Sequence, residues 1–102
     1  MPTDVLLVDD ERQILTILEE TLSTAGFRVT ARESGKAALG ALAAHQPDLM
    51  VTDLKMPGMS GLELFKQTRE LTPDTQVVIL TGFGDMNSAI EALRLGAYDY
   101  LQ

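Results

Sequence analysis

The sequence contains no cysteine and only one histidine. Without cysteine, the chain can form neither a disulfide framework nor a thiolate metal site. Basic residues are also few, because eight Lys and Arg stand against fifteen Asp and Glu, which gives a formal net charge of -7 at pH 7. Nucleic acids and anionic membranes do not attract such a chain, so we expect neither as a direct partner.

Long apolar runs are absent too. No run reaches the roughly 20 residues that span a bilayer, and the N-terminal MPTDVLLVDD has no basic segment before its short apolar run, unlike a secretory signal. A cytoplasmic location is therefore the default expectation. The composition, 45% hydrophobic and 23% charged over 102 residues, is that of one globular domain with one core.

Short apolar runs alternate with helical patterns along the whole chain. Polar alternation is absent from Val5–Val8, Leu49–Thr52 and Val77–Leu80, as is typical of strands buried on both faces of a sheet. The predicted strands are Val5–Val8, Phe27–Ala31, Leu49–Thr52, Val77–Leu80 and Tyr98–Leu101. This alternation predicts an α/β fold with a doubly wound, parallel, five-stranded sheet and helices on both faces.

Four helices are expected between these strands. The first has an apolar face and is followed by Gly26, where a helix-ending glycine belongs. That face comprises Ile14, Ile17, Leu18, Thr21, Leu22 and Ala25. The second helix covers Ala37–Ala44, and Ser60 with Glu63 forms a capping box that begins the third. The third is marked by Leu62, Phe65 and Leu71, and the fourth by Ala89, Ile90 and Leu93.

Polar side chains end three of the strands. The first strand runs into Asp9 and Asp10, the third into Asp53 and the fourth into Thr81. Because the carboxyl ends of parallel strands share one edge of a sheet, we expect these residues to converge there. Each also has a purely structural interpretation: Asp10 as the N-cap of a helix beginning at Glu11, and Asp53 and Thr81 as turn residues. Capping, however, does not explain a doubled aspartate.

Clustered carboxylates repel one another, and a divalent cation is the natural compensation. Oxygen ligands without cysteine or histidine favour Mg²⁺, and the lone His45 is expected to face solvent near a helix end. Beside such an ion, the Asp53 carboxylate is a competent nucleophile toward a phosphoryl group, with Thr81 donating a hydrogen bond to a phosphoryl oxygen.

Four segments, VDDE, VTDLKMPGMSGLEL, LTGFGD and GAYDYL, resemble the receiver domain of bacterial two-component response regulators, in particular receivers of nitrogen-regulation-type transcriptional activators. The resemblance spans residues 1–102. It implies the flavodoxin-like strand order 2-1-3-4-5 and a phosphoacceptor signalling domain. Its phosphoryl donor would be a sensor histidine kinase, and its only catalytic activity would be its own phosphorylation and dephosphorylation.

The same resemblance implies roles for individual residues. Asp53 would be the phosphoacceptor, and Asp9, Asp10, Asp53 and the backbone carbonyl of Lys55 would hold Mg²⁺. Thr81 would be the catalytic and switch hydroxyl, and Tyr100 the switch aromatic.

Receivers normally carry a lysine and a fifth helix after the segment that ends here at Gln102. We therefore expect a C-terminally incomplete receiver, a fragment rather than a natural short form, without an output domain. An uncovered face of the sheet would then favour self-association. Two alternatives stay open: an interaction module inactive in phosphotransfer, and a metal-dependent phosphatase, which typically needs a second aspartate where Lys55 stands.

Overall fold

The computed structural model describes residues 3–80 and 99–101. All neighbouring strands are parallel, and the sheet has the order β2-β1-β3-β4-β5, which confirms the predicted fold class. The predicted fourth helix lies outside the described residues. The elements are β1 (Asp4–Val8), α1 (Arg12–Thr24), β2 (Arg28–Arg32), α2 (Gly35–Ala44), β3 (Leu49–Asp53), α3 (Gly61–Leu71), β4 (Gln76–Leu80) and β5 (Asp99–Leu101).

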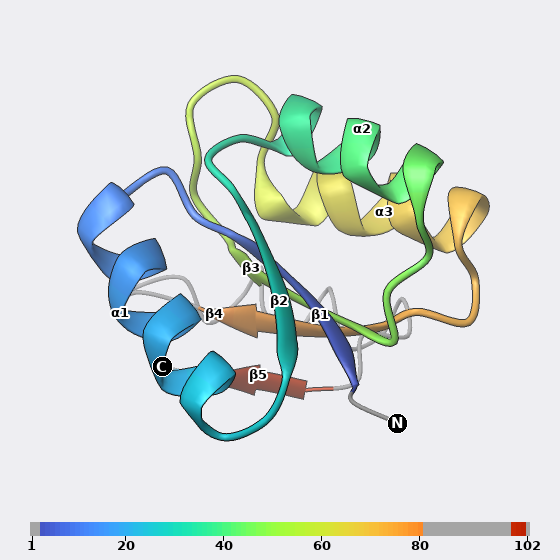
Figure 1. The fold of residues 1–102 in the computed structure, drawn as a ribbon. Coiled ribbons are helices and arrows are strands. Elements are labelled where there is room, and N and C mark those ends of the chain that lie inside the picture. The colour runs from blue at the N-terminus through green and yellow to red at the C-terminus, as the bar shows by residue number, and fades with distance from the viewer. Residues whose placement is uncertain (1–2, 81–98, 102) are drawn as a thin grey trace.

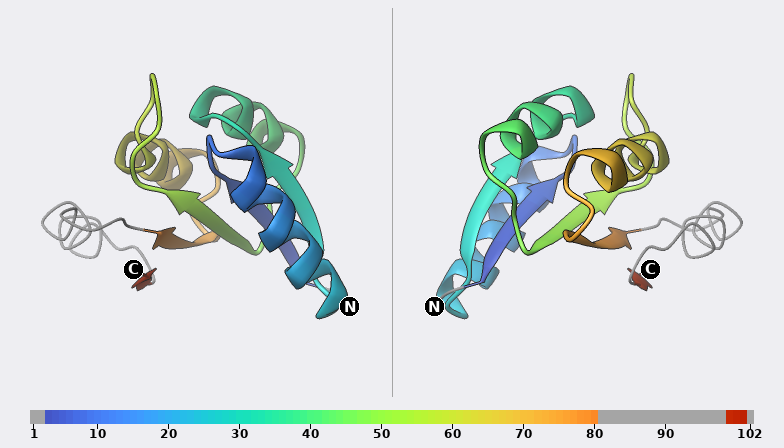
Figure 2. Two further views of the ribbon diagram at one scale, coloured as in Figure 1. Left: turned by 90° about the vertical axis from the view of Figure 1, so that its left-hand side faces the viewer. Right: turned by 90° about the vertical axis from the view of Figure 1, so that its right-hand side faces the viewer.

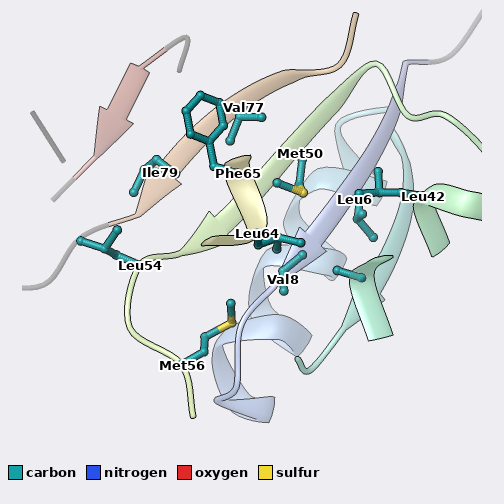
Figure 3. Packing of buried hydrophobic residues seen from close by; sticks show 11 residues of the cluster. Leu6, Val8, Leu42, Met50, Leu54, Met56, Leu64, Phe65, Val77 and Ile79 are labelled. Carbon is teal, nitrogen blue, oxygen red and sulfur yellow. The ribbon is translucent and has the colours of Figure 1, made fainter. Parts of the chain in front are cut away.

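Helices cover both faces of the sheet. Helices α2 and α3 lie on one face and α1 on the other (Figures 1 and 2). The larger core lies under α2 and α3, where Leu64 and Phe65 of α3 pack against Met50 and Ile79 of the sheet (Figure 3). These four side chains are at most 1% exposed, so this face is tightly closed. In residues 3–80 and 99–101, no helix is long and apolar enough to cross a membrane.

The buried face of α1 differs in part from the predicted one, although Leu18 and Leu22 pack toward the sheet as expected. Leu15 is buried against Val5 and Leu7 of β1, whereas Ile14 and Ile17 are 37% and 64% exposed. Leu15, Leu18 and Leu22 lie along one side of α1. This side is rotated by about 100° around the helix axis from the side of Ile14 and Ile17, because each leucine at 15 and 18 directly follows one of the isoleucines. Leu18 and Leu22 belong both to this side and to the predicted face. Periodicity alone therefore could not tell whether Leu15 or the two isoleucines face the sheet.

The helix ends follow the sequence signals closely. The Ser60 hydroxyl accepts a hydrogen bond from the Glu63 backbone N–H at 3.1 Å, so α3 begins where the capping box predicts. Ser34 caps α2 in the same way through the Ala37 N–H, which starts that helix at Gly35, two residues earlier than expected. Gly26, with a φ of 102°, follows the end of α1 in the left-handed conformation that glycine favours.

Gly61 brings the first turn of α3 against the end of β3. Its backbone N–H donates to the Leu54 carbonyl at 2.8 Å. A Cβ atom at this position would overlap the Asp53 carbonyl oxygen and lie 2.8 Å from the Leu54 Cα. A side chain at position 61 would therefore displace the backbone of Asp53 itself.

We expect Gly61→Ala to lower the free energy of unfolding by about 1–3 kcal/mol, because the added methyl overpacks rigid backbone. The matched control is Gly40→Ala, also in a helix, where a Cβ would meet nothing within 4 Å. That control should raise stability by about 0.5–1 kcal/mol through helix propensity. Urea unfolding measures both changes in stability, provided that the m-value stays the same in the variants. Equal effects of the two substitutions would contradict the packing argument.

Candidate functional site

The register of the sheet brings three aspartates to one edge. Val8 of β1 pairs with Thr52 of β3, so the next residues, Asp9 and Asp53, lie side by side where the two strands end. One carboxylate oxygen each from Asp9, Asp10 and Asp53 can be chosen so that all three lie within 4.8 Å of one another. The expected convergence of the three carboxylates is thus observed.

The first two aspartates differ in their surroundings. Asp9 is 4% exposed, and its Oδ1 accepts a hydrogen bond from the Glu11 backbone N–H at 2.9 Å. Asp10 is exposed. Helix α1 begins at Arg12 with Glu11 as its N-cap residue, and no side-chain hydrogen bond caps it. The interpretation of Asp10 as the N-cap is therefore wrong, and capping does not account for the doubled aspartate.

Burial and mutual repulsion disfavour the ionised form of the aspartates at this edge of the sheet. Burial raises the pKa of Asp53 to about 6, and the negative charge of Asp9 adds to this rise, although hydrogen bonds from the Lys55 and Leu54 backbone N–H groups oppose it. Burial likewise raises the pKa of Asp9, against the Glu11 N–H hydrogen bond and together with the charge of Asp10. The cluster is thus held together by the fold against its own repulsion.

The chemistry of the cluster fits Mg²⁺. All three donors are carboxylate oxygens, which hard cations prefer. The three aspartates offer one carboxylate oxygen each, all within 4.8 Å of one another, so these three side chains are the ones that would hold the ion. The positive charge would also offset the repulsion that raises the two pKa values.

The other predicted site residues are placed only in part. Lys55 is exposed and lies two residues beyond Asp53, and its carbonyl remains a predicted ligand. Thr81 lies outside the described residues. Tyr100 is part of β5, which pairs with β4, but its side chain lies outside what the structure describes. The switch roles of these two residues stay predictions.

The sequence reasoning missed the role of Thr52 and did not foresee how Gly61 fixes the backbone of the site. The Thr52 hydroxyl donates to the Asp53 carbonyl at 3.0 Å, and Gly61 packs against the same carbonyl. One signal for the first was available: MVTD places a threonine where the strand pattern predicts a buried apolar side chain. The second could be recognised only from the three-dimensional approach of α3 to β3.

His45 lies at a different place from the acidic cluster. It lines a cavity of about 340 Å³ together with Asp4 and Arg28, and both basic side chains contact the Asp4 carboxylate, at 3.0 Å and 2.9 Å. Asp4 begins β1, so this cavity lies toward the sheet edge opposite Asp9. The His45 side chain is 69% exposed, as expected from its position after α2.

Comparison with known proteins decides between the alternatives. The family model described as "Response regulator receiver domain" matches residues 5–102. The chain belongs to this receiver family. It is 42% identical over 97 residues to the DNA-binding transcriptional regulator NtrC of Salmonella typhimurium, covering 95% of this chain and 21% of that protein. It is 39% identical to the C4-dicarboxylate transport transcriptional regulatory protein DctD of Rhizobium meliloti, with the same coverage.

Solved structures agree with this assignment. A response regulator receiver domain protein from Clostridium thermocellum has a TM-score of 0.89 and 34% identity, covering 97% of this chain and 80% of that one. The response regulator TrrA from Thermotoga maritima, in complex with Mg²⁺ and BeF, has a TM-score of 0.86 and 31% identity, covering 97% of this chain and 84% of that one.

The family fixes the general role of this receiver. Receiver domains are signalling domains rather than general enzymes, they bind Mg²⁺ at an acidic pocket, and they interact with sensor histidine kinases. The chain therefore has a phosphoacceptor signalling role, and the alternative of an inactive interaction module is not favoured. The chain spans about a fifth of the length of these transcriptional regulators, which the comparison gives as 21%.

The electrostatics of the cluster predict that Asp53→Asn stabilises the Mg²⁺-free protein at alkaline pH. The folded-state pKa of about 6 exceeds the ordinary 3.8, so the folded state binds this proton more tightly than the unfolded state. The stability contributed by Asp53 is therefore fully present below about pH 4 and is lost as the pH rises through about 6. After allowance for solvent screening, we expect the variant to be about 1 kcal/mol more stable than wild type at pH 8, and the gain to vanish near pH 4.

Urea unfolding at both pH values, with and without Mg²⁺, measures this difference. Saturating Mg²⁺ should stabilise the wild type more than the variant, because the ion binds the folded carboxylate cluster. The control is Asp74→Asn, an exposed aspartate in the turn before β4, which should change stability by less than about 0.5 kcal/mol. A destabilised Asp53→Asn variant at pH 8 without Mg²⁺ would argue against the repulsion.

Proposed function

We propose that this receiver accepts a phosphoryl group on the Asp53 carboxylate from a phosphohistidine of a sensor histidine kinase. The observation that carries the proposal is the convergence of the partly buried Asp53 with Asp9 and Asp10 at the carboxyl edge of the sheet. Asp53 is only partly buried, and its backbone is part of β3. A partly exposed carboxylate on a fixed strand end supports a role as the nucleophile in an in-line attack on phosphorus.

The transfer itself is a displacement at phosphorus. An Asp53 carboxylate oxygen forms the new P–O bond while the P–N bond to the kinase imidazole breaks, and the electron pair stays on the leaving nitrogen. The Lys55 backbone N–H hydrogen-bonds to the Asp53 carboxyl group and so orients it. A bound Mg²⁺ supplies the positive charge that lets a phosphoryl group approach three carboxylates.

Asp9, Asp10, Asp53 and the Lys55 carbonyl are the residues that would hold the ion. The buried Asp9 is fixed by its hydrogen bond from Glu11, whereas the exposed Asp10 can adjust to the ion. By resemblance to the family, the Thr81 hydroxyl donates to a phosphoryl oxygen, and Tyr100 couples that contact to a regulatory surface. Catalysis is limited to the domain's own phosphorylation and dephosphorylation.

The wider setting follows from the relatives. NtrC and DctD are named as transcriptional regulators, which supports a role in transcription regulation in the cytoplasm. A net charge of -7 argues against direct contact of this domain with DNA. Self-association, expected from the sequence, stays a prediction that sedimentation at several concentrations tests.

Phosphorylation by a small phosphoryl donor, such as acetyl phosphate, tests the acceptor directly. Intact mass spectrometry of the wild type should show the gain of one phosphoryl group with Mg²⁺, and at least about tenfold less without it. Asp53→Asn should show no gain, because the amide is not a competent nucleophile.

Asp74→Asn again serves as the matched control and should be phosphorylated at the wild-type rate. Equal labelling of Asp53→Asn and wild type would place the acceptor elsewhere. A wild type that stays unlabelled while circular dichroism shows it folded would instead favour the inactive interaction module.

A further inference from the structure

Thr52 is a polar residue in an apolar part of the sheet. Its side chain is 0% exposed, and its register partners on the neighbouring strands are Val8 of β1 and Ile79 of β4. Both partners are also fully buried, as members of the core under α2 and α3. Valine would fill nearly the same volume without burying a hydroxyl group, which costs free energy unless it is hydrogen-bonded. The threonine at this position therefore needs an explanation.

The explanation lies in the next peptide group. The Thr52 hydroxyl donates to the Asp53 carbonyl oxygen at 3.0 Å, while the N–H of the same peptide, that of Leu54, donates to the Leu80 carbonyl of β4 at 3.0 Å. Gly61 of α3 also packs closely against the Asp53 carbonyl group. The peptide that joins Asp53 to Leu54 is thus fixed at both its oxygen and its nitrogen.

This peptide governs the position of the acceptor. It begins at the residue that carries the Asp53 carboxylate, and the following peptide supplies the Lys55 N–H that hydrogen-bonds to this carboxylate. Rotation of the Asp53–Leu54 peptide would move both the carboxylate and the loop that carries the Lys55 carbonyl. Displacements of about 1 Å in a reacting group are enough to slow a reaction substantially, by up to about a hundredfold.

We propose that Thr52 is a positioning residue for phosphoryl acceptance: its buried hydroxyl fixes the Asp53–Leu54 peptide and thereby aims the Asp53 carboxylate. The inference rests on the proposed function of Asp53 as acceptor. It extends the set of residues that serve the reaction to one that contacts neither the phosphoryl group nor the ion.

The chain offers a matched control in Thr68. Thr68 is also 0% exposed, and its hydroxyl donates to the Leu64 carbonyl at 2.8 Å, one turn earlier within α3. Replacing either threonine with valine removes one buried hydroxyl group at nearly constant volume. Only the substitution at Thr52 releases the peptide next to the acceptor.

The experiment compares Thr52→Val, Thr52→Ser and Thr68→Val by the rate of phosphorylation from acetyl phosphate at saturating Mg²⁺. We expect Thr52→Val to lower the rate about tenfold, and Thr52→Ser, which keeps the hydroxyl, to stay within about threefold of wild type. Thr68→Val should retain the wild-type rate even where urea unfolding shows a similar loss of stability. If either valine variant fails to fold, the pair Thr52→Ala and Thr68→Ala provides the same comparison.

Three results would overturn the inference: a wild-type rate in the folded Thr52 variant that lacks the hydroxyl, equal slowing by the Thr52 and Thr68 substitutions, or no rescue by serine. A labelled wild type and an unlabelled Asp53→Asn, measured alongside, show that the acceptor assignment holds independently. If the wild type is not labelled, or Asp53→Asn is labelled equally, the proposed function and the inference both fail.

Discussion

The parallel pairing of β1 with β3 is the constraint on which the site depends. The register that places Val8 opposite Thr52 leaves Asp9 beside Asp53, although like charges repel at this distance. The apolar core under α2 and α3 holds both strands in that register, because a slip by one residue would turn the buried side chains out of the core. Packing energy thus maintains an arrangement of three carboxylates that is electrostatically unfavourable in the absence of a cation.

The last residues of β3 are fixed in position by the start of α3 and by a buried hydroxyl group. Thr52 and Gly61 fix one peptide from two sides, one by a hydrogen bond and the other by having no side chain. The Ser60 cap sets where α3 begins and therefore how closely Gly61 approaches β3. Short-range signals in VTDLKMPGMSG thus combine to hold the Asp53 carboxylate on a rigid element rather than on a loose turn, which favours a defined reaction geometry.

The place of the acidic cluster in the fold could be predicted from the sequence. The carboxyl ends of parallel strands meet at one edge of the sheet, and the last residue of each predicted strand can be read from the sequence. Asp9, Asp10 and Asp53 were found in that way. The buried face of α1 was predicted only in part: Leu18 and Leu22 pack toward the sheet as expected, but Leu15 is buried in place of Ile14 and Ile17. Both sets of residues have helical spacing, so only tertiary contact selects between them. The hydrogen bond from Thr52 could not be predicted, because its geometry depends on the twist and ending of β3 rather than on residue type.

Calorimetric titration with Mg²⁺ at neutral pH tests the central claim, that the fold holds three carboxylates together as a cation site. The account predicts one ion bound per chain, with the affinity lowered at least about tenfold by Asp9→Asn and by Asp10→Asn. Asp74→Asn should leave the affinity unchanged. Absence of binding by the folded wild type, or binding that survives both substitutions in the cluster, would contradict it.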